Sequence, residues 1–112
     1  MTDPRRLIRV PVRVSMLPTS EGGRRSPVRS GFRPLCHFGS ASAQPVGLCE
    51  LELTGREQLE PGGSAEGVLQ FDVVHRDLLR ELVKPGVSIM LGDGPRIVGR
   101  AVVRQSGQSA AP

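Results

Sequence analysis

The stretch LIRVPVRVSM, residues 7–16, alternates apolar and polar side chains along its whole length. Apolar residues occupy one face of this stretch: Ile8, Val10, Val12, Val14 and Met16. A period of two is typical of a β-strand that is buried on one face. Because Pro11 has no N–H to give to a ladder, we expect an unpaired edge or a bulge at that position.

Five further segments have the length and apolar content of strands, and turn residues separate them. They are residues 33–38, 46–53, 67–74, 87–91 and 96–103. In the third of these, Leu69, Phe71 and Val73 are expected to point inward. The tetrapeptide Gly92-Asp93-Gly94-Pro95 lies between the last two segments and predicts a tight hairpin.

Residues 77–83 break the strand pattern, since their leucines and Val83 recur at helical spacing. We expect a short helical turn there, with Asp77 as a cap, that ends before Pro85 and Gly86. Six short strands with turns at near-regular spacing predict an all-β fold, a single six-stranded antiparallel barrel. Closure of the barrel removes exposed sheet edges. The predicted barrel covers residues 7–104, between an N-terminal tail, residues 1–6, and a flexible C-terminal tail, residues 105–112.

Length and composition limit the class of protein. The chain has 112 residues, enough for one domain, with three Phe and neither Trp nor Tyr, so Val, Leu and Ile must form the core. No stretch approaches the roughly 20 apolar residues of a membrane span. The first residues also lack the apolar run of a secretory signal. We therefore expect a cytoplasmic protein with no membrane partner.

Positive charge is concentrated near the N-terminus. Residues 1–40 hold eight arginines against Asp3 and Glu21, whereas the rest of the chain holds seven basic and nine acidic side chains. This asymmetry fits an anionic partner such as nucleic acid. An arginine-rich coding bias is the competing interpretation, because Lys84 is the only lysine.

The residues that carry enzyme chemistry are not grouped in this sequence. The glycines at positions 92 and 94 precede a strand rather than a helix, which indicates a hairpin and not a nucleotide fingerprint. Cys36 and His37 are neighbours in a predicted strand and point to opposite faces, so they do not suit one metal ion. We expect no catalytic residues, no cofactor, no metal ion and no small-molecule substrate.

The two cysteines have no framework spacing, and we expect two reduced, partly buried thiols. One alternative stays open. Residues 33–38 and 46–53 could form a hairpin, and Cys36 and Cys49 would then face each other across it.

The most chemically suggestive segment is a loop rich in glycine and arginine. Its candidate binding residues are Gly23, Arg24, Arg25, Arg29 and Arg33. Glycine lets the backbone approach a partner closely, and the forked guanidinium group suits phosphate. A solvated basic loop without a partner is the competing interpretation.

Here the sequence resembles a known family. Residues 21–27 (EGGRRSP) and 31–34 (GFRP), then Phe38, resemble the start of the C-terminal barrel, domain 3, of elongation factor Tu. Its later strands and its C-terminal end are resembled by residues 61–62 (PG), 86–89 (GVSI) and 94–99 (GPRIVG). Order and spacing agree from about residue 8 to residue 104. Residues 39–41 (GSA) depart from the family, which has Arg-Thr-Thr there.

The resemblance implies a six-stranded antiparallel barrel that, in the family, helps to hold aminoacyl-tRNA and contacts the GTPase domain and the exchange factor. It assigns the tRNA-facing role to Arg24 and Arg25. No GTPase domain accompanies the barrel, and we expect a stand-alone relative. Two functions follow: a non-catalytic module that binds tRNA or another structured RNA, or a protein-interaction module that mimics the barrel as a decoy, regulator or immunity-type partner.

Overall fold

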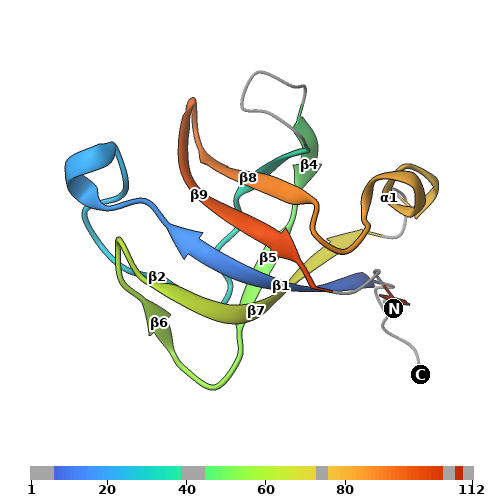
Figure 1. Cartoon of the computed structure of the whole chain (residues 1–112), viewed down its shortest axis with the longest axis horizontal. Helices are drawn as coiled ribbons and strands as arrows, with labels where there is room; N and C mark the ends of the chain where they lie inside the picture. The colour runs from blue at the N-terminus through green and yellow to red at the C-terminus, as the bar shows by residue number, and fades with distance from the viewer. Residues whose placement is uncertain (1–6, 39–44, 73–75, 105–107, 110–112) are drawn as a thin grey trace, which may run out of the picture.

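The computed structural model describes residues 7–38, 45–72, 76–104 and 108–109 (Figure 1). Strands hold 55% of the residues, which confirms the all-β prediction. The strands are β1 (Leu7–Met16), β2 (Val28–Arg29), β3 (Leu35–Phe38), β4 (Pro45–Leu48), β5 (Glu50–Leu53), β6 (Gln58–Leu59), β7 (Ser64–Asp72), β8 (Ser88–Asp93), β9 (Arg96–Val103) and β10 (Gln108–Ser109). A 3-10 turn, η1 (Thr19–Glu21), and a short helix, α1 (Arg76–Leu82), complete the described elements. Neither is long and apolar enough to cross a membrane.

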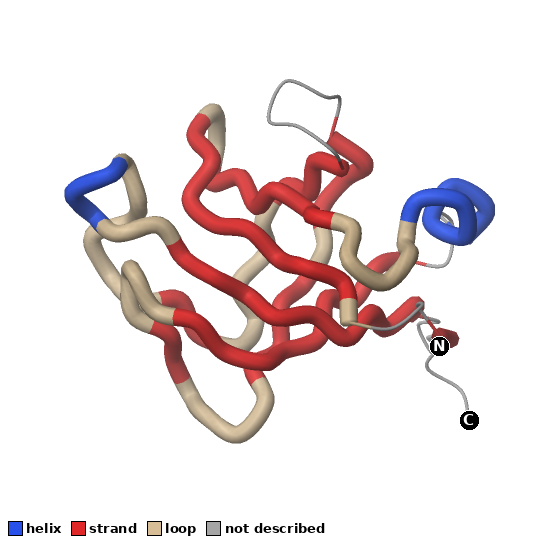
Figure 2. Tube along the Cα trace, in the orientation of Figure 1, coloured by secondary structure: helices blue, strands red, loops and turns tan. Residues whose placement is uncertain are grey.

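The main sheet is antiparallel and runs in the order β4-β3-β8-β9-β1-β7-β5, while β10 adds to β1. A separate two-stranded sheet joins β2 to β6. Figure 2 shows that the main sheet curls, with η1 and α1 at opposite ends of the molecule. β1 lies inside the sheet, paired with β7 on one side and with β9 and β10 on the other.

The irregularity expected at Pro11 lies between two partners of β1. The ladder to β10 covers Ile8 and Arg9, and the ladder to β9 begins at Val12. Between them, the carbonyl of Pro11 accepts a hydrogen bond from the N–H of Arg104 at 2.9 Å. The missing N–H of proline therefore falls at the gap where β1 changes partner.

The predicted closed barrel is wrong, because the main sheet is an open antiparallel half-barrel. Its end strands β4 and β5 are successive pieces of one segment, separated by Cys49. β4 pairs with β3 and β5 pairs with β7. The chain before β3 pairs with β5 through an isolated bridge between Phe32 and Leu51 and not through a ladder. A continuous ladder fails here because Pro34 has no N–H to donate.

We call residues 30–36 and 49–53 the seam. Across it, the N–H of Leu51 donates to the carbonyl of Phe32 at 2.8 Å, and the N–H of Cys49 donates to the carbonyl of Pro34 at 3.2 Å. A disulfide joins Cys36 to Cys49, with their Cα atoms 6.7 Å apart. The expectation of two reduced thiols is therefore wrong. The two cysteines do face each other, as the alternative had it.

The core is apolar throughout the described residues, where no polar or charged side chain is buried. The inward face of β1 is buried as the alternation predicted, and it packs with side chains from β5, β7, β8 and β9. The largest fully buried ones are Phe71, Leu51, Leu69, Ile89 and Leu91. Phe38 packs beside Phe71, with 6.2 Å between the ring centroids. The inward positions predicted in β7 are confirmed at Leu69 and Phe71, while Val73 lies outside the described residues.

Two local predictions are confirmed. The helical turn predicted at residues 77–83 is present as α1, and Leu79 and Val83 are buried. Asp77 lies in its first turn rather than before it. The β8–β9 hairpin has Asp93 opposite Arg96.

The predicted tails are described only at residues 108–109. These form β10, with Ser109 opposite Ile8 and Gln108 opposite Arg9. The predicted tail residues 1–6, 105–107 and 110–112 lie outside the described residues, as do residues 39–41.

The inward and outward faces of β7 predict unequal effects of two neighbouring substitutions. Leu69→Ala removes a fully buried side chain and should lower the free energy of unfolding by about 2–5 kcal/mol. Val68→Ala, on the half-buried outer face, should cost less than about 1 kcal/mol. Urea unfolding measures both values, and equal losses would contradict the assigned faces.

Candidate nucleic-acid interface

The loop that joins β1 to β3 has a defined conformation. η1 ends at Gly22, which adopts a left-handed backbone with φ of 94°. The N–H of Gly23 then donates to the carbonyl of Pro18 at 3.0 Å. The Thr19 hydroxyl donates to the carbonyl of Arg24 at 2.6 Å. These bonds close the loop on itself before its arginines begin.

Gly23 lies inside this loop rather than at a partner surface. The residue is buried, and a Cβ at this position would collide with the backbone carbonyl of Leu17. Glycine is needed here because the chain packs against itself. The predicted role of Gly23, a close approach to a partner, therefore has no room in this conformation.

Arg24 is engaged in contacts within the protein. Its guanidinium group forms an ion pair with Asp93 in the β8–β9 turn, 2.5 Å from Nη1 to Oδ2. The same group lies over the ring of Phe32, 5.1 Å from its centroid. Its side chain is only 25% exposed, and its Nε is buried without a partner among the described residues. Arg24 therefore links the loop to the β8–β9 hairpin.

The other three predicted arginines point outward. Arg25 and Arg29 are exposed and form no ion pair among the described residues. The side chain of Arg33 is 70% exposed and meets Glu50 at 3.6 Å. The structure thus separates the five predicted residues into an internal pair, Gly23 and Arg24, and three accessible cations on the loop.

The structure adds Arg96 to these candidates. Arg96 begins β9 directly opposite Asp93, and it is exposed without an ion pair among the described residues. Since Arg24 holds Asp93, the turn that carries Arg96 is fixed to the loop that carries Arg25. The hairpin itself was predictable, but the sequence holds no signal that joins it to a loop 69 residues away.

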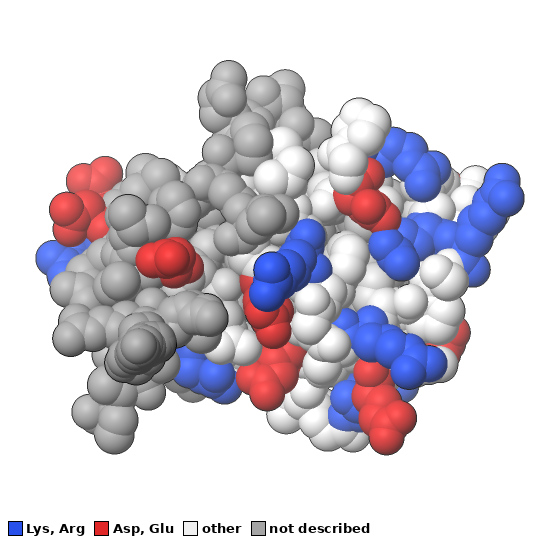
Figure 3. Space-filling model, turned by 180° about the vertical axis from the view of Figure 1, so that it is seen from behind, with Lys and Arg blue, Asp and Glu red and all other residues white. Residues whose placement is uncertain are grey.

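We call Arg25, Arg29, Arg33 and Arg96 the basic surface. In Figure 3, Lys and Arg side chains gather on the right of the view, with acidic side chains among them. That side corresponds to the η1 end at the left of Figure 1.

Arginines on β1, and Arg104 after β9, are matched by glutamates, whereas Arg100 in β9 is exposed without an ion pair in the described part of the chain. Arg9 meets Glu52 at 3.3 Å, and Arg13 and Arg104 both meet Glu66, at 2.9 and 3.3 Å. Each of these cations already meets a carboxylate, with Arg13 and Arg104 sharing that of Glu66. The basic surface differs because three of its four arginines have no such partner in the described part of the chain.

Within residues 7–38, 45–72, 76–104 and 108–109, no three His, Cys, Asp or Glu side chains are placed to hold a metal ion. The chain matches no family model and no curated protein.

The contacts of Arg24 predict that it orders the loop while Arg25 does not. Arg24→Met keeps the apolar stem but removes the ion pair and the cation–π contact, together about 1 kcal/mol. The amide of Gly23 should then exchange with solvent about fivefold faster. Arg25→Met is the matched control and should leave this rate unchanged. Hydrogen exchange followed by NMR measures both, and equal effects would contradict an internal role for Arg24.

Proposed function

We propose that this chain is a non-catalytic β-domain that binds structured RNA, such as tRNA, through its basic surface. The observation that carries the proposal is the contrast between two groups of arginines. Those on β1 are paired with glutamates, whereas Arg25, Arg29 and Arg96 are exposed and unpaired among the described residues. Unpaired, accessible guanidinium groups are the form in which arginine binds phosphate.

The order of the loop supports this proposal. Binding costs less conformational entropy when the donors are held in place before the partner arrives. Hydrogen bonds within the loop and the Arg24–Asp93 ion pair restrict the backbone next to Arg25. RNA stems are recognised largely through phosphates and 2′-hydroxyls, so a small set of fixed cations suits them.

The resemblance to domain 3 of elongation factor Tu points in the same direction, with one change of residues. It implies that Arg24 and Arg25 face tRNA. Because Arg24 is held by Asp93 and Phe32, we assign the phosphate contacts to Arg25, Arg29, Arg33 and Arg96 instead. Arg24 then acts on the loop and not on the RNA.

Phosphate contacts make binding depend on salt. The affinity for deacylated tRNA should fall steeply as salt rises, by about 0.9 log units per log unit of salt for each phosphate neutralised. The double variant Arg25→Ala with Arg29→Ala should lower the slope by about two and weaken binding to all stems alike. Fluorescence anisotropy over a salt series measures both quantities.

The control removes the same charge from the paired part of the sheet. Arg9→Ala with Arg13→Ala should change the slope much less, because each of these arginines already meets a carboxylate. Equal slopes for the two double variants would mean that net charge alone drives binding. Absence of tRNA binding by the unmodified chain at low salt would refute the proposal.

A protein partner is the second candidate, favoured by the outer face of β3 and β8. Leu35 and Met90 lie on this face, since their strand neighbours Cys36, Ile89 and Leu91 are buried. Both side chains are half-buried, and contiguous apolar surface is typical of protein contacts.

The partner fitting the resemblance is elongation factor Tu or its exchange factor. Purified partner should then bind in the presence of nuclease, and Met90→Glu should abolish this binding without changing the affinity for tRNA. If neither purified protein binds, the second candidate fails.

A further inference from the structure

The disulfide joins β3 to the residue at which the seam begins on the other segment. Cys36 belongs to β3, and Cys49 stands at the point where the chain leaves β4 for β5. Ladders hold each end strand to one neighbour, whereas an isolated bridge between Phe32 and Leu51 and a few single hydrogen bonds join the two sides of the seam. Cys36 itself pairs with Gly47 and Leu91, so the covalent bond ties a laddered strand to a stretch that has no continuous ladder across the seam.

The seam also leads into the basic surface. Phe32 accepts the hydrogen bond from Leu51 with its carbonyl and supports the Arg24 guanidinium with its ring. Gly31 donates to the carbonyl of Leu51 at 2.8 Å. A displacement of Phe32 in the seam would therefore also move the ring that supports Arg24 in the loop.

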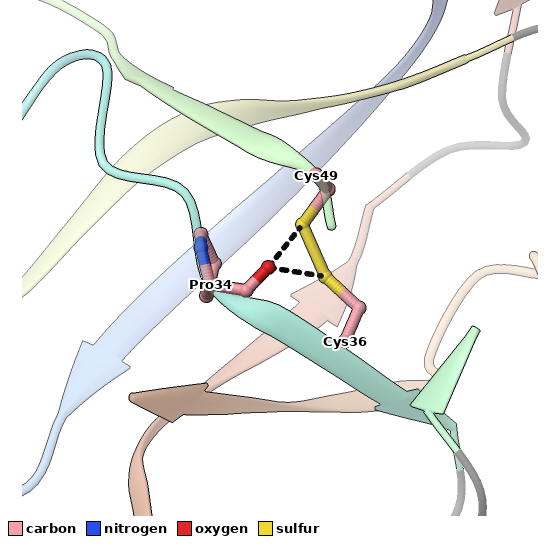
Figure 4. The surroundings of a disulfide bond; sticks show 3 residues. All are labelled: Pro34, Cys36 and Cys49. Atoms are coloured by element: carbon pink, nitrogen blue, oxygen red, sulfur yellow. Dashed lines mark hydrogen bonds between the residues drawn. A yellow bond between two sulfur atoms is a disulfide. The ribbon is translucent and has the colours of Figure 1, made fainter. Parts of the chain in front are cut away.

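The surroundings of the two sulfur atoms suit a thiol as well as a disulfide. The carbonyl oxygen of Pro34 lies 4.0 Å from Sγ of Cys36 and 3.8 Å from Sγ of Cys49 (Figure 4). A disulfide has no proton to donate, whereas either thiol can donate one to this oxygen. The reduced pair therefore has an acceptor in place, and the core around it need not unfold.

We propose that the Cys36–Cys49 disulfide is a redox-sensitive clasp of the seam. In the oxidised chain it fixes β3 to the β4–β5 junction, and in the reduced chain the seam opens while the ladders of β1 persist. The reductant is a dithiol. One thiolate attacks a cysteine sulfur and releases the other cysteine; the second thiol then displaces the first cysteine, so the dithiol becomes a disulfide and the protein gains two electrons and two protons.

Burial determines how this exchange proceeds. Cys36 is fully buried and Cys49 is 3% exposed, so a thiolate reaches them only when the seam opens locally. The rate of reduction should therefore level off as the concentration of dithiol rises. Closure of a loop with a sequence separation of 13 also predicts that the melting temperature falls by roughly 10 °C on reduction.

The test is hydrogen exchange on the full chain before and after reduction by dithiothreitol, with the gain of two hydrogens confirmed by mass. The amides of Gly31 and Leu51 should exchange at least about tenfold faster in the reduced chain, while those of Val12 and Val14 in β1 stay unchanged. The double variant Cys36→Ala with Cys49→Ala should exchange at the faster rate with or without reductant. None of these readouts depends on RNA.

Three results would overturn the proposal. The seam amides could keep their rates after complete reduction, which would make the disulfide passive. The amides of β1 could accelerate equally, which would indicate a general loss of stability. Mass analysis of the air-oxidised chain could find two free thiols, in which case no clasp forms.

Discussion

The pairing of β1 on both of its edges is the constraint on which the other elements depend. Its inward side chains, Ile8, Val10, Val12, Val14 and Met16, are all buried, and its neighbours β7 and β9 bring the facing core residues. A slip of one residue would turn every buried valine to solvent and every arginine inward. Because β1 fixes the register of both neighbours, it also fixes where the loop after Met16 begins and where the β8–β9 hairpin ends.

Those two places form the candidate interface. The loop and the hairpin turn come from opposite ends of the sequence, and the Arg24–Asp93 ion pair holds them together. Gly23 and Arg24 serve the packing of the loop, and this leaves Arg25, Arg29, Arg33 and Arg96 for a partner. The proposal of RNA binding thus requires that Arg24 orders the loop while the neighbouring Arg25 binds the partner.

Local patterns predicted much of the fold. Alternation identified β1 and the inward residues of β7, and the turn residues 92–95 identified the β8–β9 hairpin, because both signals lie within a few consecutive residues. The closed barrel was wrong because closure depends on how residues 30–34 meet β5, and Pro34 interrupts that pairing. The disulfide was missed because compartment and spacing are poor guides to whether two cysteines face each other.

The same limit applies to the candidate site. Exposed arginines on a glycine-rich loop were predictable from composition, and three of the four predicted arginines are exposed cations. The internal role of Arg24 was not predictable, because its partners Phe32 and Asp93 come from separate elements. A tertiary ion pair leaves no periodic or spacing signal in a single sequence.

The central claim is that the basic surface, and not the sheet as a whole, meets the partner. The most direct test is NMR mapping, in which deacylated tRNA is added to the isotopically labelled chain and the backbone amide shifts are followed. The account predicts shifts that cluster at residues 23–33 and 93–96, with little change at Arg9, Arg13 and Glu66. Shifts centred on β1, β5 and β7, or none at saturating tRNA, would contradict it.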